Sequence, residues 1–249
     1  MAGVTKSDVM NSGVKNSSSY SWLVRGSFSP GRVRARWTTS TRRIDPDIEH
    51  AIDVAWTTTL QRPGVTLFDG PVVRCESFEM AADETLELSI SRASYKICVG
   101  THFINPHFPP EVRANLIGAS TGVISSDGHL LMGVRNHRVA YYPGRVHPFA
   151  GSLEVREVVD VFEDARREIL EEIGVQSSEI TSIRCMGIAR DEVLFHPELI
   201  FIARTSLLAS EIESRLDKDE HESVVRVVDI EDERLTPIAR AIANLKFQF

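Results

Sequence analysis

The chain has 249 residues, of which 42% are hydrophobic and 25% are charged, a composition that excludes a largely disordered or fibrous protein. No apolar stretch reaches the roughly 20 residues that a membrane-spanning helix needs, so we expect no membrane partner. The net charge of -7 disfavours nucleic acid as a partner, because an acidic protein repels phosphates. The three cysteines form no C-x-x-C pair, which argues against a disulfide framework or structural zinc and favours a reducing, cytoplasmic location.

Residues 1–43 differ from the rest of the chain and are predicted to be a flexible basic tail. They hold eight basic residues and one acid, with many serines and little periodicity. Segments of this kind have too little apolar surface to fold alone. An organelle transit peptide is the alternative, because transit peptides are rich in Arg and Ser and poor in acids. The protein would then be organelle-targeted rather than cytoplasmic.

Residues 44–110 are predicted to form a small N-terminal α+β module. Asp45 can cap a helix, and Pro46 suits the first helical turn. The residues that follow predict strands over 72–78, 86–90 and 95–103. No motif in this module carries chemistry of its own.

Residues 111–249 are predicted to form a second domain in which strands and helices alternate. The pattern predicts a hairpin around the Asp127-Gly128 turn and a long helix over 158–173 that ends at Gly174. Further strands are expected at 183–188, 199–203 and 224–228, and further helices at 207–216 and 237–245. This alternation indicates an α/β fold with helices layered on a sheet.

Three acidic residues in the long helix are the main candidates for a chemical site. Glu168, Glu171 and Glu172 stand at positions i, i+3 and i+4, so a helix places them on one face. Like charges at this spacing repel, and a divalent cation such as Mg²⁺ or Mn²⁺ would offset the repulsion. A solvated acidic face without a ligand is the alternative.

The segment around these acids resembles the Nudix box, G-x5-E-x7-R-E-U-x-E-E-x-G-U, where U is a bulky aliphatic residue. Residues 167–175 read R-E-I-L-E-E-I-G-V and match its second half, and Gly151 and Glu157 match its beginning. Nine residues rather than seven separate Glu157 from Arg167, which indicates a two-residue insertion before the helix and leaves the role of Glu157 open.

The resemblance implies a Nudix-type α/β/α sandwich with a mixed sheet, occupying residues 111–249. It implies hydrolysis of a nucleoside diphosphate linked to another moiety, with Glu168, Glu171 and Glu172 holding Mg²⁺ or Mn²⁺. Glu171 or Glu172 would also serve as the base, and Arg167 would orient the glutamates. Gly151 would let the backbone approach the metal or phosphate. A further acidic ligand is expected from a distant loop, with Glu220 and Glu222 as candidates.

Two shorter motifs narrow the expected substrate. Residues 187–192 and 220–223 are similar to the corresponding segments of Nudix-type UDP-glucose and UDP-galactose diphosphatases, which release UMP and a sugar 1-phosphate. Arg135 and Arg138 are candidate phosphate ligands, and Tyr142, with its neighbour Tyr141, is a candidate for stacking on uracil. The alternatives are another nucleotide derivative (ADP-ribose, a dinucleotide or a coenzyme A derivative) or a non-catalytic Nudix-fold module that binds nucleotide. The oligomeric state is not predicted.

Overall fold

The fold is built on a large mixed sheet. The computed structural model describes residues 19–63, 67–139, 141–218 and 220–246. Within these residues the sheet has eight strands in the order β1-β9-β10-β5-β6-β11, with β7 beside β6 and β8 beside β5. The strands are β1 (Tyr20–Phe28), β5 (Gly118–Ile124), β6 (Leu130–Arg135), β7 (Val146–His147), β8 (Phe149–Ser152), β9 (Ile180–Asp191), β10 (His196–Thr205) and β11 (His221–Val227). β10 and β5 run parallel, and the other described pairs of this sheet are antiparallel.

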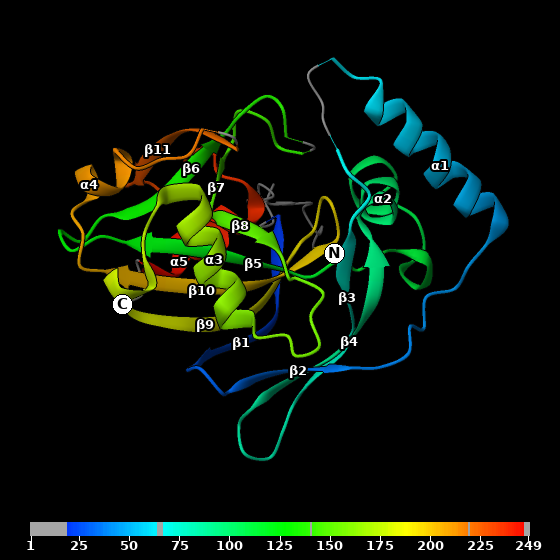
Figure 1. The fold of residues 1–249 in the computed structure, drawn as a ribbon, viewed down its shortest axis with the longest axis horizontal. Coiled ribbons are helices and arrows are strands. Elements are labelled where there is room, and N and C mark those ends of the chain that lie inside the picture. Colours follow the sequence, from blue (N-terminus) through cyan, green and yellow to red (C-terminus); the bar gives the residue numbers. More distant parts are fainter. Residues whose placement is uncertain (1–18, 64–66, 140, 219, 247–249) are drawn as a thin grey trace, which may run out of the picture.

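Helices cover both faces of this sheet (Figure 1). α3 (Val161–Ile173) packs against β5 and β8, whereas α5 (Pro237–Lys246) packs against β5, β9 and β10. Successive side chains of β10 enter two different cores: Phe201 lies in the core under α3, and Ile200 in the core under α5. This period of two is the alternation expected of a strand that is buried on both faces. The expected α/β/α layering with a mixed sheet is therefore confirmed.

A second sheet stands beside the first, in the order β2-β4-β3 (Figure 1). Its elements and the remaining short helices are β2 (Val33–Trp37), β3 (Pro71–Met80), β4 (Leu86–Ser94), α1 (Pro46–Leu60), α2 (Tyr95–Cys98), the π-helix η1 (Val99–Ile104), η2 (Pro110–Val112), η3 (Ser177–Glu179) and α4 (Ala209–Glu213). Val73 and Leu88 of this sheet belong to the same buried cluster as Phe162 of α3. The two sheets thus share one core. The division of the chain into an N-terminal module (44–110) and a second domain (111–249) stays a prediction.

Two predictions about the N-terminal half are wrong. Residues 20–37 are not a flexible tail, because β1 pairs with β9, which lies about 160 residues further along the chain, and β2 pairs with β4. Residues 95–104 are helical rather than a strand, and the Asp69 side chain accepts a hydrogen bond from the backbone N–H of Lys96 at the first turn. Both outcomes depend on partners that are distant in sequence. Residues 38–43 of the predicted tail form neither helix nor strand, but the backbone N–H groups of Thr38 and Arg43 bond to Ile90 and Glu111. Residues 1–18 lie outside the described residues.

In the described part of the chain, no helix combines the length and the apolar character that crossing a membrane requires.

Candidate active site

Helix α3 positions the acidic residues, and local sequence defines both of its ends. The Asp160 side chain caps the first turn by accepting hydrogen bonds from the backbone N–H groups of Phe162 and Glu163. Gly174 ends the helix in the left-handed conformation, with φ of 62°. Ile169 and Ile173 are fully buried in the core. The acids are therefore carried by a helix that is fixed along its length.

The three glutamates of α3 differ in their exposure to solvent. Glu168 and Glu172 are buried, whereas 56% of the Glu171 side chain is exposed. Arg167 lies between Glu168 and Glu171: its Nη2 is 2.6 Å from Oε1 of Glu168, and its Nη1 is 3.0 Å from Oε2 of Glu171. Nε of Arg167 is 3.1 Å from Oε1 of Glu154. Arg167 thus offsets part of the repulsion among the carboxylates.

Burial dominates the protonation of the two inner glutamates. It raises the pKa of Glu168 to about 8, with Arg167 opposing the shift and Glu172, Glu171 and Glu220 adding to it. Burial also raises the pKa of Glu172 well above its usual range, and the nearby charge of Glu220 contributes. Two carboxyl groups are therefore held where their negative charge is unfavourable unless a cation is near.

Glu172 has two polar neighbours on the sheet. Its Oε1 accepts a hydrogen bond of 3.2 Å from the backbone N–H of Ala150, and its Oε2 is 3.0 Å from Nε2 of His221. Gly133 makes room for His221, because a Cβ at residue 133 would lie 2.3 Å from Nδ1 of the histidine. The sequence interpretation missed His221, although the histidine stands between the predicted acids Glu220 and Glu222.

Gly151 is required by the position of Glu168. A Cβ on Gly151 would lie 2.0 Å from Oε1 of Glu168, far inside van der Waals contact. The sequence interpretation expected Gly151 to let the backbone approach a metal or phosphate. In the structure the group that approaches this backbone is the Glu168 carboxylate.

The donor set suits a hard divalent cation, although its side chains contact other protein groups in this conformation. Among the described residues, no three Asp, Glu, His or Cys side chains are grouped so that they could hold a metal ion. Glu168 and Glu171 are turned to Arg167, and Glu172 to His221. Carboxylate oxygens are the ligands that Mg²⁺ and Mn²⁺ prefer, and a cation would relieve the cost of burying Glu168 and Glu172. The residues fit such an ion if these side chains change partners.

The acidic face of α3 opens into a groove of about 480 Å³. Its lining includes Glu168, Glu171 and Arg167 from the helix, Glu154 from the preceding loop, and Glu220 from the segment before β11. Glu220 is exposed and lines the groove, and its role as a further acidic ligand stays a prediction. Glu222 does not line it: its Oε1 is 3.9 Å from Nε2 of His137 at the surface.

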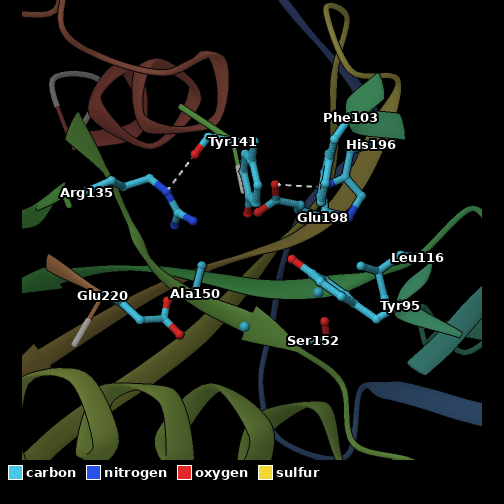
Figure 2. A pocket seen from close by; sticks show the side chains of 12 residues that line it. Tyr95, Phe103, Leu116, Arg135, Tyr141, Ala150, Ser152, His196, Glu198 and Glu220 are labelled. Atoms are coloured by element: carbon cyan, nitrogen blue, oxygen red, sulfur yellow. Dashed lines mark hydrogen bonds and ion pairs between the residues drawn. The ribbon is translucent and has the colours of Figure 1, made fainter. Parts of the chain in front are cut away.

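A second cavity, which we call the chamber, adjoins the groove and has a volume of about 230 Å³ (Figure 2). Gly151, Ser152 and Glu220 line both spaces. The rest of the chamber wall is mainly aromatic, basic and acidic, comprising Tyr95, Phe103, Leu116, Gly118, Arg135, Tyr141, Ala150, His196 and Glu198. Tyr95 and Phe103 come from α2 and η1, so the N-terminal segment contributes to a site that was expected only from residues 111–249.

The structure brings some of the predicted substrate-binding residues to the chamber and leaves others outside. Arg135 lines the chamber, with its guanidinium carbon 4.4 Å from the centre of the Tyr141 ring. Arg138 is exposed and donates to the backbone oxygen of Lys218, so it lines neither space. Tyr142 donates a 2.8 Å hydrogen bond to Asp191, and its neighbour Tyr141 occupies the wall instead.

Glu157, the acid whose role the longer spacing left open, is not the partner of Arg167. Glu157 is exposed, and its backbone oxygen accepts a hydrogen bond from the Trp37 indole. Glu154, three residues earlier, lies in the groove and forms the ion pair with Arg167. The longer spacing between Glu157 and Arg167 therefore accompanies a loop that brings a different acid to the arginine.

We expect the free energy of unfolding to depend on pH through Glu168. Because its pKa is about 8 in the folded protein against about 4.5 usually, the folded state retains a proton that the unfolded chain releases. This contribution to stability is complete below about pH 4.5 and is lost as pH rises through about 8, with a slope of at most about 1.4 kcal/mol per unit. Urea unfolding with a chelator should show the wild type losing stability relative to Glu168→Gln between pH 5 and pH 8.

The matched control for this measurement is Glu163→Gln, which alters an exposed carboxylate of the same helix. It should follow the wild type across the range. A constant difference between wild type and Glu168→Gln at all pH values would contradict the expectation.

Among known proteins, the chain is similar only to solved structures. No family model and no curated protein matches the chain. The MutT protein from Methanosarcina mazei Go1 is 15% identical, and the match covers 53% of this chain and 93% of that one with a TM-score of 0.40. DR0079 from Deinococcus radiodurans is 15% identical over 55% of this chain and 87% of its own, with a TM-score of 0.42. A bifunctional NMN adenylyltransferase/ADP ribose pyrophosphatase from Francisella tularensis, complexed with AMP and a Mn ion, is 16% identical over 54% of this chain and 41% of its own, with a TM-score of 0.40. At these values the likeness assigns no activity or ligand to this chain.

Proposed function

We propose that this protein is a metal-dependent diphosphatase that cleaves a nucleoside diphosphate linked to another moiety. The observation that carries the proposal is the junction of the acidic groove and the aromatic chamber along Gly151, Ser152 and Glu220. A diphosphate at this junction would extend one substituent into the chamber, while the groove offers carboxylates for the cations that accompany phosphates. The resemblance of residues 151–175 to the Nudix box supports the same reaction.

Glu168, Glu171 and Glu172 would hold Mg²⁺ or Mn²⁺, and Glu220 lines the same groove as Glu168 and Glu171. When bound, the cation would neutralise phosphate charge and would make water a better nucleophile. Glu171 is the most exposed of the three acids of α3, which favours it as the group that takes a proton from water. Glu172 is less suited to that role, because its two oxygens already contact Ala150 and His221.

The arginines have separate tasks in this proposal. Arg167 orients Glu168 and Glu171 through its ion pairs. Arg135 binds phosphate oxygens at the chamber side, because no carboxylate within 4.0 Å neutralises it among the described residues and its guanidinium points into the chamber (Figure 2). Arg167 thus orients the carboxylates and Arg135 binds the diphosphate, and neither takes part in proton transfer.

Within this class we propose UDP-glucose or UDP-galactose as the substrate, giving UMP and a sugar 1-phosphate. The motifs at residues 187–192 and 220–223 support the choice. The second motif contains Glu220 and His221, which lie at the groove and against Glu172. The aromatic wall of the chamber can stack on a sugar or a base.

A substrate panel tests both the diphosphatase activity and the preference for UDP-sugars. Purified protein with Mg²⁺ is incubated with UDP-glucose, UDP-galactose, ADP-ribose, a dinucleotide and a coenzyme A derivative, and the products are separated by chromatography. We expect UMP and sugar 1-phosphate from the UDP-sugars. Hydrolysis of only the other substrates would refute the UDP-sugar assignment. Binding without hydrolysis of any substrate would refute the enzyme proposal and favour the nucleotide-binding module.

A further inference from the structure

A buried carboxylate that the proposed reaction does not use lies in the wall of the chamber. Glu198 is carried by β10 and is only 3% exposed, yet it lines the cavity (Figure 2). Its Oε2 accepts a hydrogen bond from Ser120 Oγ, and its Oε1 is 3.3 Å from Nδ1 of His196. A buried charge is costly unless it is satisfied, so a carboxylate at the wall of a cavity requires a reason.

The surroundings of Glu198 keep it ionised. Burial opposes the charge, but hydrogen bonding and the nearby imidazoles of His196 and His147 outweigh it and lower the pKa of Glu198 to about 2. An ionised carboxylate can only accept hydrogen bonds, and its two oxygens offer about four acceptor positions. Ser120 occupies one position on Oε2, and Nδ1 of His196 lies 3.3 Å from Oε1. The remaining positions are available to hydroxyl groups of a molecule in the chamber.

The chamber is divided between an anion-binding side and an anion-repelling side. Arg135, which is positively charged, lines it from β6, and Glu198, which is negatively charged, lines it from β10 (Figure 2). Arg135 stands in the same part of the wall as Glu220 and Ala150, where the chamber meets the groove. A ligand with a phosphate at Arg135 therefore presents its non-phosphate part to Glu198.

The rest of the wall suits a ring that carries hydroxyl groups. Phe103 and Tyr141 stack on each other with their centres 4.5 Å apart, and they form an apolar face beside Glu198. The hydroxyl of Tyr95 points into the same space (Figure 2). Gly118 also lines the chamber, where β5 and β8 lie so close that a Cβ on Gly118 would be 2.7 Å from the backbone oxygen of Gly151. Apolar faces with hydroxyl acceptors between them match a neutral sugar.

We propose that Glu198 is a specificity-determining residue: it accepts hydrogen bonds from the hydroxyl groups of a neutral sugar ring in the chamber and rejects a ring that carries negative charge. The proposal rests on the proposed diphosphatase function and identifies the part of the substrate that enters the chamber. Its physical basis is the repulsion of two like charges at a cavity wall, where the effective dielectric constant is lower than in bulk water.

The test is a comparison of UDP-glucose with UDP-glucuronate, which differ in one carboxylate on the sugar. We expect the wild type to prefer UDP-glucose in kcat/KM. Glu198→Gln keeps the shape of the side chain and removes its charge, and it should shrink this preference on the order of tenfold or more. Because both substrates are measured on the same preparation, a reduced folded fraction cancels in the ratio. Glu213→Gln, at an exposed carboxylate paired with Arg226, is the matched control and should leave the ratio unchanged.

A binding measurement separates this proposal from the reaction itself. Calorimetry with glucose 1-phosphate and glucuronic acid 1-phosphate reports the selectivity of the chamber without any hydrolysis. If the wild type hydrolyses nothing but prefers glucose 1-phosphate, and Glu198→Gln reduces that preference, the diphosphatase proposal fails and the role of Glu198 stands. If UDP-glucose is hydrolysed but the preference is the same in the wild type and Glu198→Gln, the role of Glu198 is refuted.

Discussion

Replacing Glu171 with glutamine is expected to lower kcat for diphosphate hydrolysis by about 100-fold or more, the usual loss when one group that stabilises transition-state charge is removed. The amide cannot take a proton from water and is a weaker ligand for a divalent cation. Because 56% of the Glu171 side chain is exposed, the free energy of unfolding should stay within about 0.5 kcal/mol of the wild type. Steady-state kinetics over a range of Mg²⁺ concentrations, together with urea unfolding, measure both quantities.

Glu163→Gln provides the control for this variant, since Glu163 is an exposed carboxylate of the same helix that pairs with Arg166 and lines neither cavity. It should retain wild-type kcat. Wild-type turnover by Glu171→Gln at saturating Mg²⁺ would show that Glu171 is neither the base nor a required ligand.

Gly151→Ala is expected to reduce kcat about 100-fold through a steric effect on Glu168, because displacing a catalytic group by about 1 Å costs a factor of this size. The new methyl group would lie 2.0 Å from Oε1 and 2.4 Å from Oε2 of Glu168, so the carboxylate must move away from its position. Because the struck atoms are the end of a flexible side chain beside the groove, the free energy of unfolding should fall only by about 1 kcal/mol. Kinetics and urea unfolding of the same preparation measure the two effects.

A double variant identifies the cause. Gly151→Ala combined with Glu168→Ala removes the group that the methyl would strike, so stability should recover while activity stays low. If the double variant is as unstable as Gly151→Ala, the clash with Glu168 is not the source of the defect. If Gly151→Ala keeps wild-type kcat, the position of Glu168 is not needed for turnover.

Helix α3 could be predicted from its own residues. The cap at Asp160, the buried positions Ile169 and Ile173, and the left-handed Gly174 all act within one or two turns. The predicted start at residue 158 was three residues early, because the Asp160 side chain accepts from the backbone N–H groups of the first turn and so sets the beginning of the helix. The shared face of Glu168, Glu171 and Glu172 follows from the same helical period.

The N-terminal segment could not be predicted in the same way, because its structure depends on distant partners. β1 pairs with β9, where Gly187 adopts φ of 117° and passes so close to Val24 that a Cβ would lie 2.1 Å from the Val24 oxygen. Nothing in the Ser- and Arg-rich composition before residue 43 reveals this pairing. Residues 95–103 were assigned to a strand for a similar reason, since the Asp69 hydrogen bond at the first turn of α2 comes from another segment.

The candidate site likewise has a part that could be predicted from local sequence and a part that could not. Residue types and spacing were sufficient to indicate an acidic helix face, a capped helix and a glycine beside it, because helical geometry relates neighbours within four positions. Tertiary packing decided which of these acids are buried and brought Glu154 rather than Glu157 to Arg167. It also placed Tyr95, Phe103 and Glu198 around the chamber next to the groove. Burial and cavity walls arise where segments far apart in the chain meet, and no local pattern records that meeting.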